Sequence, residues 1–375
     1  TAGAEVVGRM IQSREYIHPA TYIGKGKITE LKELLWETDA TGIICDDELT
    51  SVQLKNLEQE LGCKIIDRTL LILDIFAARA VSSEGKIQVE LAQLKYRASR
   101  LIGLGNSLSR LGGGIGTRGP GEKKLEMDRR LIRERISRLK KELREVEQHR
   151  ELIRTQRKDS NLKVAALVGY TSAGKSSLEN TLTGAGILED AMLFSTLDTT
   201  TRALELEGKQ QVLLTDTVGF IRKLPHHLIE AFKSTLEEAK YADIIIHVVD
   251  ASNPQMDTQM YVVYDTLRQL GVEGKPIITL FNKQDKLESP QMFRDLHADY
   301  TFAVSAKTGQ GLDELKGALL DIIRQDQIYV ERLYDFSEAG KIQLIRKQGQ
   351  LLEEEYVAEG IAVKAYVPKS IYGRI

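Results

Sequence analysis

The chain has 375 residues, which is more than one ordinary hydrophobic core accommodates, so we expect two or three domains. Its hydrophobic share of 42% is that of a folded globular protein. Its net charge of −2 excludes a general electrostatic attraction to nucleic acid, so any such affinity must come from local patches.

Two further features limit the function classes. The two cysteines, Cys45 and Cys63, provide neither a metal-ligand set nor a disulfide framework, so we interpret them as small, partly buried thiols in a reducing cytoplasm. The chain has no run of about 18 apolar residues and no basic leader with an apolar core, so we expect neither a membrane span nor a secretion signal. Because the chain begins with Thr1 instead of Met, we expect part of the natural N-terminus to be missing.

Residues 1–87 alternate helical and strand patterns. Apolar periodicity predicts helices over 28–38 and around 50–61. Short apolar runs predict strands at Gly42–Cys45 and Lys64–Asp67. This alternation is typical of a small α/β unit.

The next segment, 88–160, carries two helical patterns with matching apolar seams. In each pattern the apolar positions step by three and four residues, as in a coiled coil. The seams are Leu91, Leu94, Ala98, Leu101, Gly105 and Leu108, and then Ile132, Ile136, Leu139, Leu143 and Val146. Two such helices with a short connection predict an antiparallel hairpin.

A glycine-rich loop, 112–121, separates the two seams and can continue neither helix. Basic residues follow it, but acidic residues are interleaved with them, so a solvated helix with intrahelical ion pairs is one interpretation. We prefer contact with RNA, because a flexible backbone with cationic side chains suits irregular RNA. The predicted RNA-binding residues are Gly113, Gly114, Arg118, Gly121, Lys123, Lys124, Arg129 and Arg130.

Residues 161–325 carry four separated motifs, and the first is a phosphate-binding loop. It follows the apolar run 164–168 and opens a helical pattern, which is the context that such a loop requires. Its backbone N–H groups would hold phosphates, Lys175 would contact the β- and γ-oxygens, and the Ser176 hydroxyl would bind Mg²⁺. The predicted nucleotide-binding residues here are Gly169, Tyr170, Thr171, Ser172, Ala173, Gly174, Lys175, Ser176 and Ser177. Alone, this loop also fits an adenylate-type kinase.

The other three motifs select the nucleotide. Asp216 ends an apolar run and is predicted to hold the magnesium shell, and Gly219 leaves room for a γ-phosphate. Asp285 offers two acceptor oxygens to N1–H and N2–H₂ of guanine, a donor pair that adenine lacks, which argues against the kinase. The predicted base-binding residues are Asn282, Lys283, Asp285, Ser305, Ala306 and Lys307. The four motifs in this order predict a doubly wound, mostly parallel GTPase domain.

GTP hydrolysis needs charge stabilisation, a magnesium shell and a positioned water. We predict that Lys175, Thr200 and Gly219 are the catalytic residues. Thr200 is predicted to sense the γ-phosphate and to complete the magnesium shell with Ser176 and Asp216, and Thr201 is the near alternative.

Three other positions bear on the reaction. Phe220 stands where many GTPases carry a water-orienting Gln, so we expect slow intrinsic turnover with activation by a partner surface. The adjacent His226 and His227 are interpreted as solvated residues and not as bases. His247 lies in an apolar strand pattern and is interpreted as a satisfied core histidine.

The last segment, 326–375, is predicted to form strand, helix and strand, around 334–336, over 340–348 and over 362–367. We expect a small appended α+β module, and the pattern does not indicate its task.

Several further segments resemble the HflX family of bacterial ribosome-associated GTPases, and the likeness runs nearly end to end. Besides the nucleotide motifs, these segments are 22–27, 71–76, 88–96 and 112–122. The resemblance implies binding to the large ribosomal subunit and its rRNA, with the hairpin near the peptidyl-transferase region. It also implies dissociation or rescue of stalled ribosomes under stress. We expect a cytoplasmic monomer that uses GTP and Mg²⁺.

Three positions depart from that family's usual pattern. Ser172 replaces an Asn that is associated with a potassium ion in related GTPases, so the use of K⁺ is left open. Thr199 stands where Pro is usual, and Glu179 replaces a Phe one turn into the following helix. A buried carboxylate costs several kcal/mol unless it reaches solvent or a partner. The alternatives are therefore an RNA-binding or ribosome-assembly factor that uses GTP as a docking signal with little turnover, or one with a second, ATP-dependent activity in the N-terminal unit.

Overall fold

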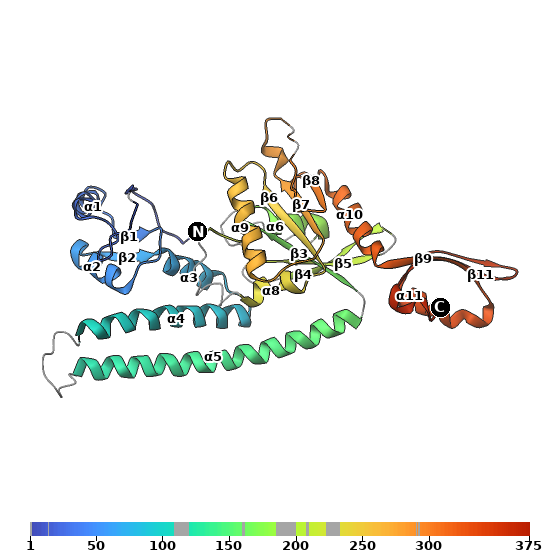
Figure 1. The fold of residues 1–375 in the computed structure, drawn as a ribbon, viewed down its shortest axis with the longest axis horizontal. Helices are drawn as coiled ribbons and strands as arrows, with labels where there is room; N and C mark the ends of the chain where they lie inside the picture. Colours follow the sequence, from blue (N-terminus) through green and yellow to red (C-terminus); the bar gives the residue numbers. More distant parts are fainter. Residues whose placement is uncertain are drawn as a thin grey trace. The chain divides into compact units, whose positions relative to one another are not determined.

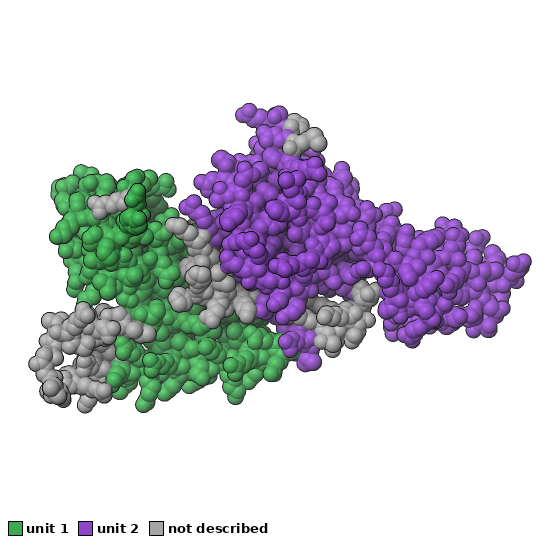
Figure 2. Space-filling view, in the orientation of Figure 1, with its two compact units in different colours: residues 1–148, 223–233 green, residues 149–222, 234–375 purple. Residues whose placement is uncertain are grey.

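The computed structural model describes residues 2–13, 15–108, 120–159, 162–184, 200–207, 210–222, 233–289, 291 and 293–375. Of these, 101–108, 120–125, 153–159 and 233–235 are described by their backbone alone. The chain forms two compact units, 1–148 with 223–233, and 149–222 with 234–375 (Figure 2). Within the described ranges, no helix is long and apolar enough to cross a membrane.

The first unit begins with the predicted α/β arrangement (Figure 1). Helices α1 (Lys25–Glu37) and α2 (Ser51–Leu61) alternate with strands β1 (Gly42–Cys45) and β2 (Lys64–Asp67), which pair in parallel. The bounds of both strands are as predicted. A third helix, α3 (Arg68–Arg79), follows β2 directly and was not predicted as an element.

One buried carboxylate joins the elements of this unit. Asp67 has no exposed surface and accepts hydrogen bonds from the backbone N–H groups of Leu49 at 3.1 Å and Leu70 at 2.9 Å. The Tyr96 hydroxyl donates to it at 2.8 Å, and the Arg100 guanidinium forms an ion pair with it. Asp67 therefore caps α3 and fastens α4 (Ser83–Leu108) to the sheet.

The predicted helical hairpin is confirmed. Helix α4 and helix α5 (Pro120–Asp159) lie side by side and run in opposite directions (Figure 1). Arg135 Nε and Nη2 donate to the two carboxylate oxygens of Glu90 at 2.8 and 2.9 Å, and Leu139 of the predicted seam is fully buried. The chain crosses from the first unit to the second within α5.

The glycine-rich loop is shorter than predicted, because α5 begins at Pro120 and so includes Gly121. Proline suits a first helical position, where its missing N–H would have no intrahelical partner. Gly113, Gly114 and Arg118 lie outside the described residues, as do Thr199, His226 and His227, and the side chains of Lys123 and Lys124 are not described. The exposed Arg130 pairs with Glu134 at 3.3 Å, as the solvated interpretation of this helix expects.

The second unit is built on a six-stranded sheet in the order β4-β5-β3-β6-β7-β8 (Figure 1). The strands are β3 (Lys163–Gly169), β4 (Thr200–Glu205), β5 (Gln211–Asp216), β6 (Ile244–Asp250), β7 (Ile277–Asn282) and β8 (Tyr300–Ala303). Only the edge strand β4 is antiparallel to its neighbour among these strands. The doubly wound, mostly parallel fold is therefore confirmed.

Helices cover both faces of this sheet, which explains why its central strands are apolar at successive positions. Helices α6 (Lys175–Thr183) and α10 (Leu312–Gln325) pack on one face, against residues such as Leu167 and Ile246. Helix α9 (Met256–Gln269) lies on β6 and β3, and a short helix, α8 (Lys233–Tyr241), precedes β6. The parallel strands thus end at one common edge of the sheet, where the predicted motifs follow them.

The C-terminal module is an antiparallel sheet in the order β10-β11-β9, made of β9 (Gln327–Tyr334), β10 (Gln350–Val357) and β11 (Gly360–Pro368). Helix α11 (Ala339–Gln348) packs on it, and a short helix, α12 (Lys369–Tyr372), follows β11. The predicted strand around 334–336 is wrong in its bounds, because β9 ends at Tyr334. Strand β10 was missed.

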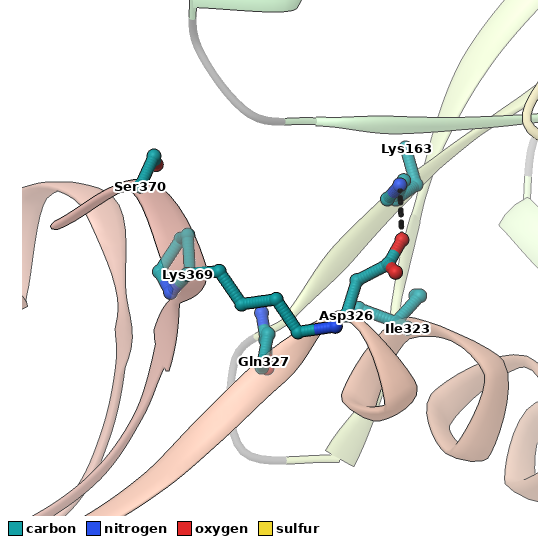
Figure 3. A pocket seen from close by; sticks show the side chains of 7 residues that line it. Lys163, Ile323, Asp326, Gln327, Lys369 and Ser370 are labelled. Carbon is teal, nitrogen blue, oxygen red and sulfur yellow. Dashed lines mark hydrogen bonds and ion pairs between the residues drawn. The ribbon is translucent and has the colours of Figure 1, made fainter. Parts of the chain in front are cut away.

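Polar contacts join this module to the nucleotide domain at the start of β3 (Figure 3). Lys163 Nζ lies 2.8 Å from the carboxylate of Asp326 and 3.6 Å from that of Asp243. The Lys163 ammonium holds the pKa of Asp326 below its usual value. A cavity of about 260 Å³ lies beside this pair, and Lys369 points into it (Figure 3).

Candidate functional site

The phosphate-binding loop connects β3 to α6 in a backbone conformation that its glycines permit. Gly174 has a φ of 98°, and a Cβ at this position would lie 2.3 Å from Nδ2 of Asn282. Ser172 also has a positive φ, 63°, although it is not glycine. The loop therefore has the shape that a phosphate cradle requires, and no larger residue fits at Gly174.

Lys175 is the first residue of α6, directly after the loop, and is only 6% exposed. Its Nζ donates to the carbonyl oxygens of Gly169 at 3.3 Å and Tyr170 at 3.2 Å. Burial lowers the pKa of Lys175, while the negative charge of Asp216 acts in the opposite direction. A phosphate anion at this position would stabilise the ammonium in the same way.

Ser176 and Asp216 provide a hard oxygen pair for a divalent cation. The Ser176 hydroxyl donates to Oδ2 of Asp216 at 2.7 Å, and Asp216 is 1% exposed at the end of β5. A hydroxyl oxygen and a carboxylate suit Mg²⁺, which is bound by few protein groups together with phosphate oxygens and water. These two residues fit the predicted metal role.

The hydroxyls of Thr200 and Thr201, which were predicted as candidates for the magnesium shell, contact other side chains in the structure. Thr200 is the first residue of β4, opposite Asp216, and its hydroxyl donates to Glu179 at 2.9 Å. The Thr201 hydroxyl lies 3.1 Å from that of Thr215. The magnesium role of Thr200 and its alternative, Thr201, therefore stay predictions.

Gly219 and Phe220 pack directly on the phosphate-binding loop. A Cβ at Gly219 would lie 2.9 Å from Thr171 Cα and 3.0 Å from Lys175 Nζ, so glycine keeps the space beside the ammonium open. The N–H of Phe220 donates to Gly169 O at 3.0 Å, and Thr171 N–H donates to Phe220 O at 2.9 Å. The Phe220 side chain is 3% exposed, so it orients no water.

Asn282 joins the base-binding motifs to the phosphate-binding loop. Its Nδ2 donates to Ala173 O at 2.9 Å, and its Oδ1 accepts from Ala306 N–H at 2.9 Å. Asp285 accepts at Oδ1 from the Ser305 hydroxyl at 2.7 Å. The three motifs that were predicted from separate stretches are thus in direct contact at the ends of β3, β7 and β8.

Two residues that support the site, Asp250 and Thr181, were not predicted. Lys283 Nζ donates to Ser172 O at 2.7 Å and to the carboxylate of Asp250 at 2.6 Å, so Asp250 at the end of β6 positions a motif lysine. The Thr181 hydroxyl of α6 donates to Ala306 O at 2.7 Å. The position of Asp250 directly after an apolar run, like that of Asp216, was a signal that could have found it. Nothing in the local pattern around Thr181 indicated its contact.

Glu179 is buried, and its carboxylate has polar partners, which a buried acid at this position requires. It is 2% exposed, accepts from Thr200 Oγ1, and has Arg202 Nε at 3.7 Å from Oε2. Burial raises the pKa of Glu179 to about 7, and the Thr200 hydrogen bond and Arg202 act against that rise. The acid is therefore accommodated, at a cost that these partners reduce.

His247 is a core residue, 1% exposed, but it is not fully satisfied as predicted. Its ring packs edge-on against Tyr264, with 5.1 Å between the centroids, and its Nδ1 has no hydrogen-bond partner among the described residues. Burial lowers the pKa of His247 to about 4, so the ring is neutral near pH 7. The nearby carboxylate of Asp295 accepts from Thr279 and Tyr264, which fastens the loop before β8.

Three family models match this chain. Residues 1–77 match a model described as GTP-binding GTPase N-terminal, and 79–157 match GTP-binding GTPase Middle Region. Residues 164–283 match a model described as 50S ribosome-binding GTPase. Together they span the first unit, the hairpin and most of the nucleotide site.

Curated relatives match the chain over nearly its whole length. The chain is 65% identical to a GTPase HflX of Lacrimispora saccharolytica, over all of this chain and 89% of the relative. It is 39% identical to GTPase HflX of Escherichia coli, over 98% of this chain and 87% of the relative. A GTP-binding protein of Sulfolobus solfataricus, solved with GDP, is 27% identical with a TM-score of 0.45, over 83% of this chain and 89% of that one. The full-length matches show that the chain belongs to the HflX family, P-loop GTPases that hydrolyse GTP.

Proposed function

We propose that this GTPase binds the large ribosomal subunit and that it dissociates or rescues stalled ribosomes under stress. The observation that carries the proposal is the match of 164–283 to the 50S ribosome-binding GTPase model, on a chain whose four nucleotide motifs meet at one edge of the sheet. We place its action in the cytoplasm. One chain supplies all four motifs, and we propose that it acts as a monomer.

The residues of the site have separate roles in this proposal. Lys175 and the loop N–H groups bind the phosphates of GTP, and Asp285 accepts from the guanine base. Ser176 and Asp216 would hold Mg²⁺, and Thr200 would be the third protein contributor when GTP is bound. The ion would neutralise charge that develops on the phosphate oxygens. Gly219 keeps the γ-phosphate position open.

Hydrolysis by the free protein is slow in this proposal. The buried Phe220 cannot orient the attacking water, and its backbone is fixed to the phosphate-binding loop by two hydrogen bonds. A partner surface must therefore complete the site. The large ribosomal subunit is that partner.

Turnover with purified large subunits tests this directly. GTP hydrolysis should rise by at least about tenfold when subunits are added, which corresponds to about 1.4 kcal/mol off the barrier. Small subunits serve as the matched control. Fast turnover without ribosomes, or no change with large subunits, would refute the proposed activation and favour GTP as a docking signal.

The helical hairpin would provide the RNA contact. Replacing Arg118, Lys123 and Lys124 by Ala should weaken subunit binding and flatten its salt dependence, by roughly 0.7 to 0.9 in the log–log slope for each lost phosphate contact. Replacing the exposed Arg138, Lys141 and Arg144 on α5 by Ala is the control for loss of charge alone. Co-sedimentation of the tip variant equal to wild type across a salt series would return α5 to its solvated interpretation.

Potassium dependence is the remaining open point of the site. Ser172 has a short side chain, and its carbonyl oxygen is held by Lys283 at 2.7 Å. We expect turnover in potassium chloride and sodium chloride to be equal within about twofold, because a hydroxyl reaches less far than the amide of Asn. A large stimulation by potassium alone would show that the loop binds the ion without that amide.

A further inference from the structure

Glu179 belongs to none of the four motifs, yet it joins two elements of the nucleotide site. It lies on α6, and its Oε2 accepts from Thr200 Oγ1 at 2.9 Å. Arg202 Nε lies 3.7 Å from the same oxygen. The carboxylate therefore connects α6 with the first and third residues of β4.

Both ends of this connection also meet the metal pair. Thr200 lies opposite Asp216 in the antiparallel register of β4 and β5. Ser176 donates to Asp216 at 2.7 Å, and it precedes Glu179 by three residues on the same helix, so the two residues share one face. Two side-chain hydrogen bonds, from Thr200 to Glu179 and from Ser176 to Asp216, thus link α6 with β4 and with β5, which pair with each other.

Packing alone does not explain an acid in this position. An apolar side chain of similar size would avoid the desolvation of a buried carboxylate. Oε1 of Glu179 has no hydrogen-bond partner among the described residues. The hydrogen bonds of the carboxylate are therefore not all satisfied at this position. What Glu179 adds is an acceptor oxygen for Thr200 and a polar partner beside Arg202.

We propose that Glu179 is a positioning residue of the GTPase site, which holds Thr200 against α6 and so fixes the start of β4 relative to Ser176 and Asp216. The inference rests on the proposed binding of GTP and Mg²⁺ at this site. Thr200 donates its single hydroxyl proton to Glu179, so its oxygen lone pairs stay available on the other side.

The sheet order makes the expected effect local. Strands β5, β3 and β6 separate β4 from β7, which carries the guanine-binding Asp285 just after its end. Loss of the Glu179 contact should therefore disturb the metal end of the site and leave recognition of the base unchanged.

Two variants that remove the hydrogen bond between Glu179 and Thr200, and one variant that keeps it, test the proposal. Glu179→Leu and Thr200→Val each remove the hydrogen bond from one side, and Glu179→Gln keeps an acceptor oxygen for Thr200. The first measurement is the Mg²⁺ concentration that gives half-maximal binding of a fluorescent, non-hydrolysable GTP analogue. The second is single-turnover GTP hydrolysis with large subunits, normalised to the fraction of protein that binds GDP.

We expect Glu179→Leu to raise the Mg²⁺ midpoint and to slow single turnover by about fivefold or more each, with the GDP affinity within about twofold of wild type. Glu179→Gln should stay within about twofold in both. The double variant Glu179→Leu/Thr200→Val should be no worse than Thr200→Val alone, because Thr200→Val already removes the hydroxyl through which Glu179 acts. Thr183→Ala, which removes a hydroxyl contact to the backbone oxygen of Glu179, is the matched control and should behave as wild type.

Three results would overturn the proposal. The effects of Glu179→Leu and Thr200→Val could multiply in the double variant, or Glu179→Gln could be as damaging as Glu179→Leu. The third is that Glu179→Leu lowers the affinities for GDP and for the GTP analogue equally. If Glu179→Leu fails to fold, Thr200→Val and Glu179→Gln still decide it. Failure of the proposed ribosome activation can be told apart from failure of the Glu179 proposal. Without that activation, large subunits would not stimulate the wild type, but the Mg²⁺ midpoints of the variants would still test Glu179.

Discussion

Replacement of Asp285 by Asn should reverse the choice of base. In the structure the Ser305 hydroxyl donates to Oδ1 of Asp285 at 2.7 Å. An Asn at this position would keep its carbonyl oxygen on that hydroxyl, because the amide nitrogen cannot accept. Its NH₂ group would then take the place of Oδ2 and would face the donors of guanine.

The magnitude follows from the hydrogen bonds that are lost. In the proposed contact guanine donates N1–H and N2–H₂ to the carboxylate, and bonds to a charged group contribute about 1.5 to 3 kcal/mol each. We expect GDP affinity to fall by about 3 kcal/mol or more, which is at least about a hundredfold. Xanthine carries an oxygen where guanine carries N2–H₂, so the variant should bind xanthosine diphosphate more tightly than wild type does.

Calorimetric titration with both diphosphates measures this exchange. Glu288→Gln is the matched control, since it makes the same acid-to-amide change at an exposed site three residues away. Unchanged GDP affinity in the Asp285→Asn variant would refute the assignment of the base site. Equal loss of both nucleotides would show that Asp285 supports the loop and does not read the base.

Three other variants probe the nucleotide site, the core of its domain and the first unit. Gly219→Ala should weaken binding of a GTP analogue by at least about tenfold and GDP binding less, because its Cβ would lie 2.9 Å from the backbone of the phosphate-binding loop; equal affinities for both would contradict this. Burial lowers the pKa of His247 to about 4 from an ordinary 6.5, so its contribution to stability is fully present above pH 6.5 and is lost as pH falls toward 4. From pH 7 to 4.5, urea unfolding should therefore show wild type losing about 2 kcal/mol relative to His247→Phe, and parallel pH profiles would exclude this role. Arg100→Ala should destabilise the first unit by about 3 kcal/mol, because it leaves the buried Asp67 without its cation. Hydrogen exchange of β2 and α3 measures that loss, with the exposed Arg97→Ala as control.

Elements with a strong local signal were predictable from the sequence. Strands β1 and β2 have the predicted bounds, because each is a short apolar run between polar turns. Strand β10 was missed because it contains three successive glutamates, 353–355, of which two are exposed. An edge strand with little buried surface carries no apolar alternation, and charge there protects the edge from pairing with other chains.

The motifs of the candidate site have local signatures in the sequence, but the contacts between them do not. Each motif has a local signature, since a phosphate loop or a guanine-binding quartet follows its own strand. The hydrogen bond from Asn282 to Ala173 joins positions 109 residues apart, and that from Lys283 to Ser172 joins positions 111 apart. No sequence pattern states which side chain closes such a distance, because this depends on the order of the strands in the sheet.

These long-range contacts give the predicted guanine-binding motif a second role, which is to support the phosphate-binding loop. Asn282 is 2% exposed, with one end of its amide on Ala173 and the other on Ala306, so its polar atoms serve the loops on either side. Lys283 likewise holds the carbonyl of Ser172, a residue that has a positive φ of 63°. Contacts from the base-binding side therefore help to hold the phosphate-binding loop in its strained shape. A site ordered in this way loses little conformational entropy on binding, so more of the contact energy of GTP remains as affinity.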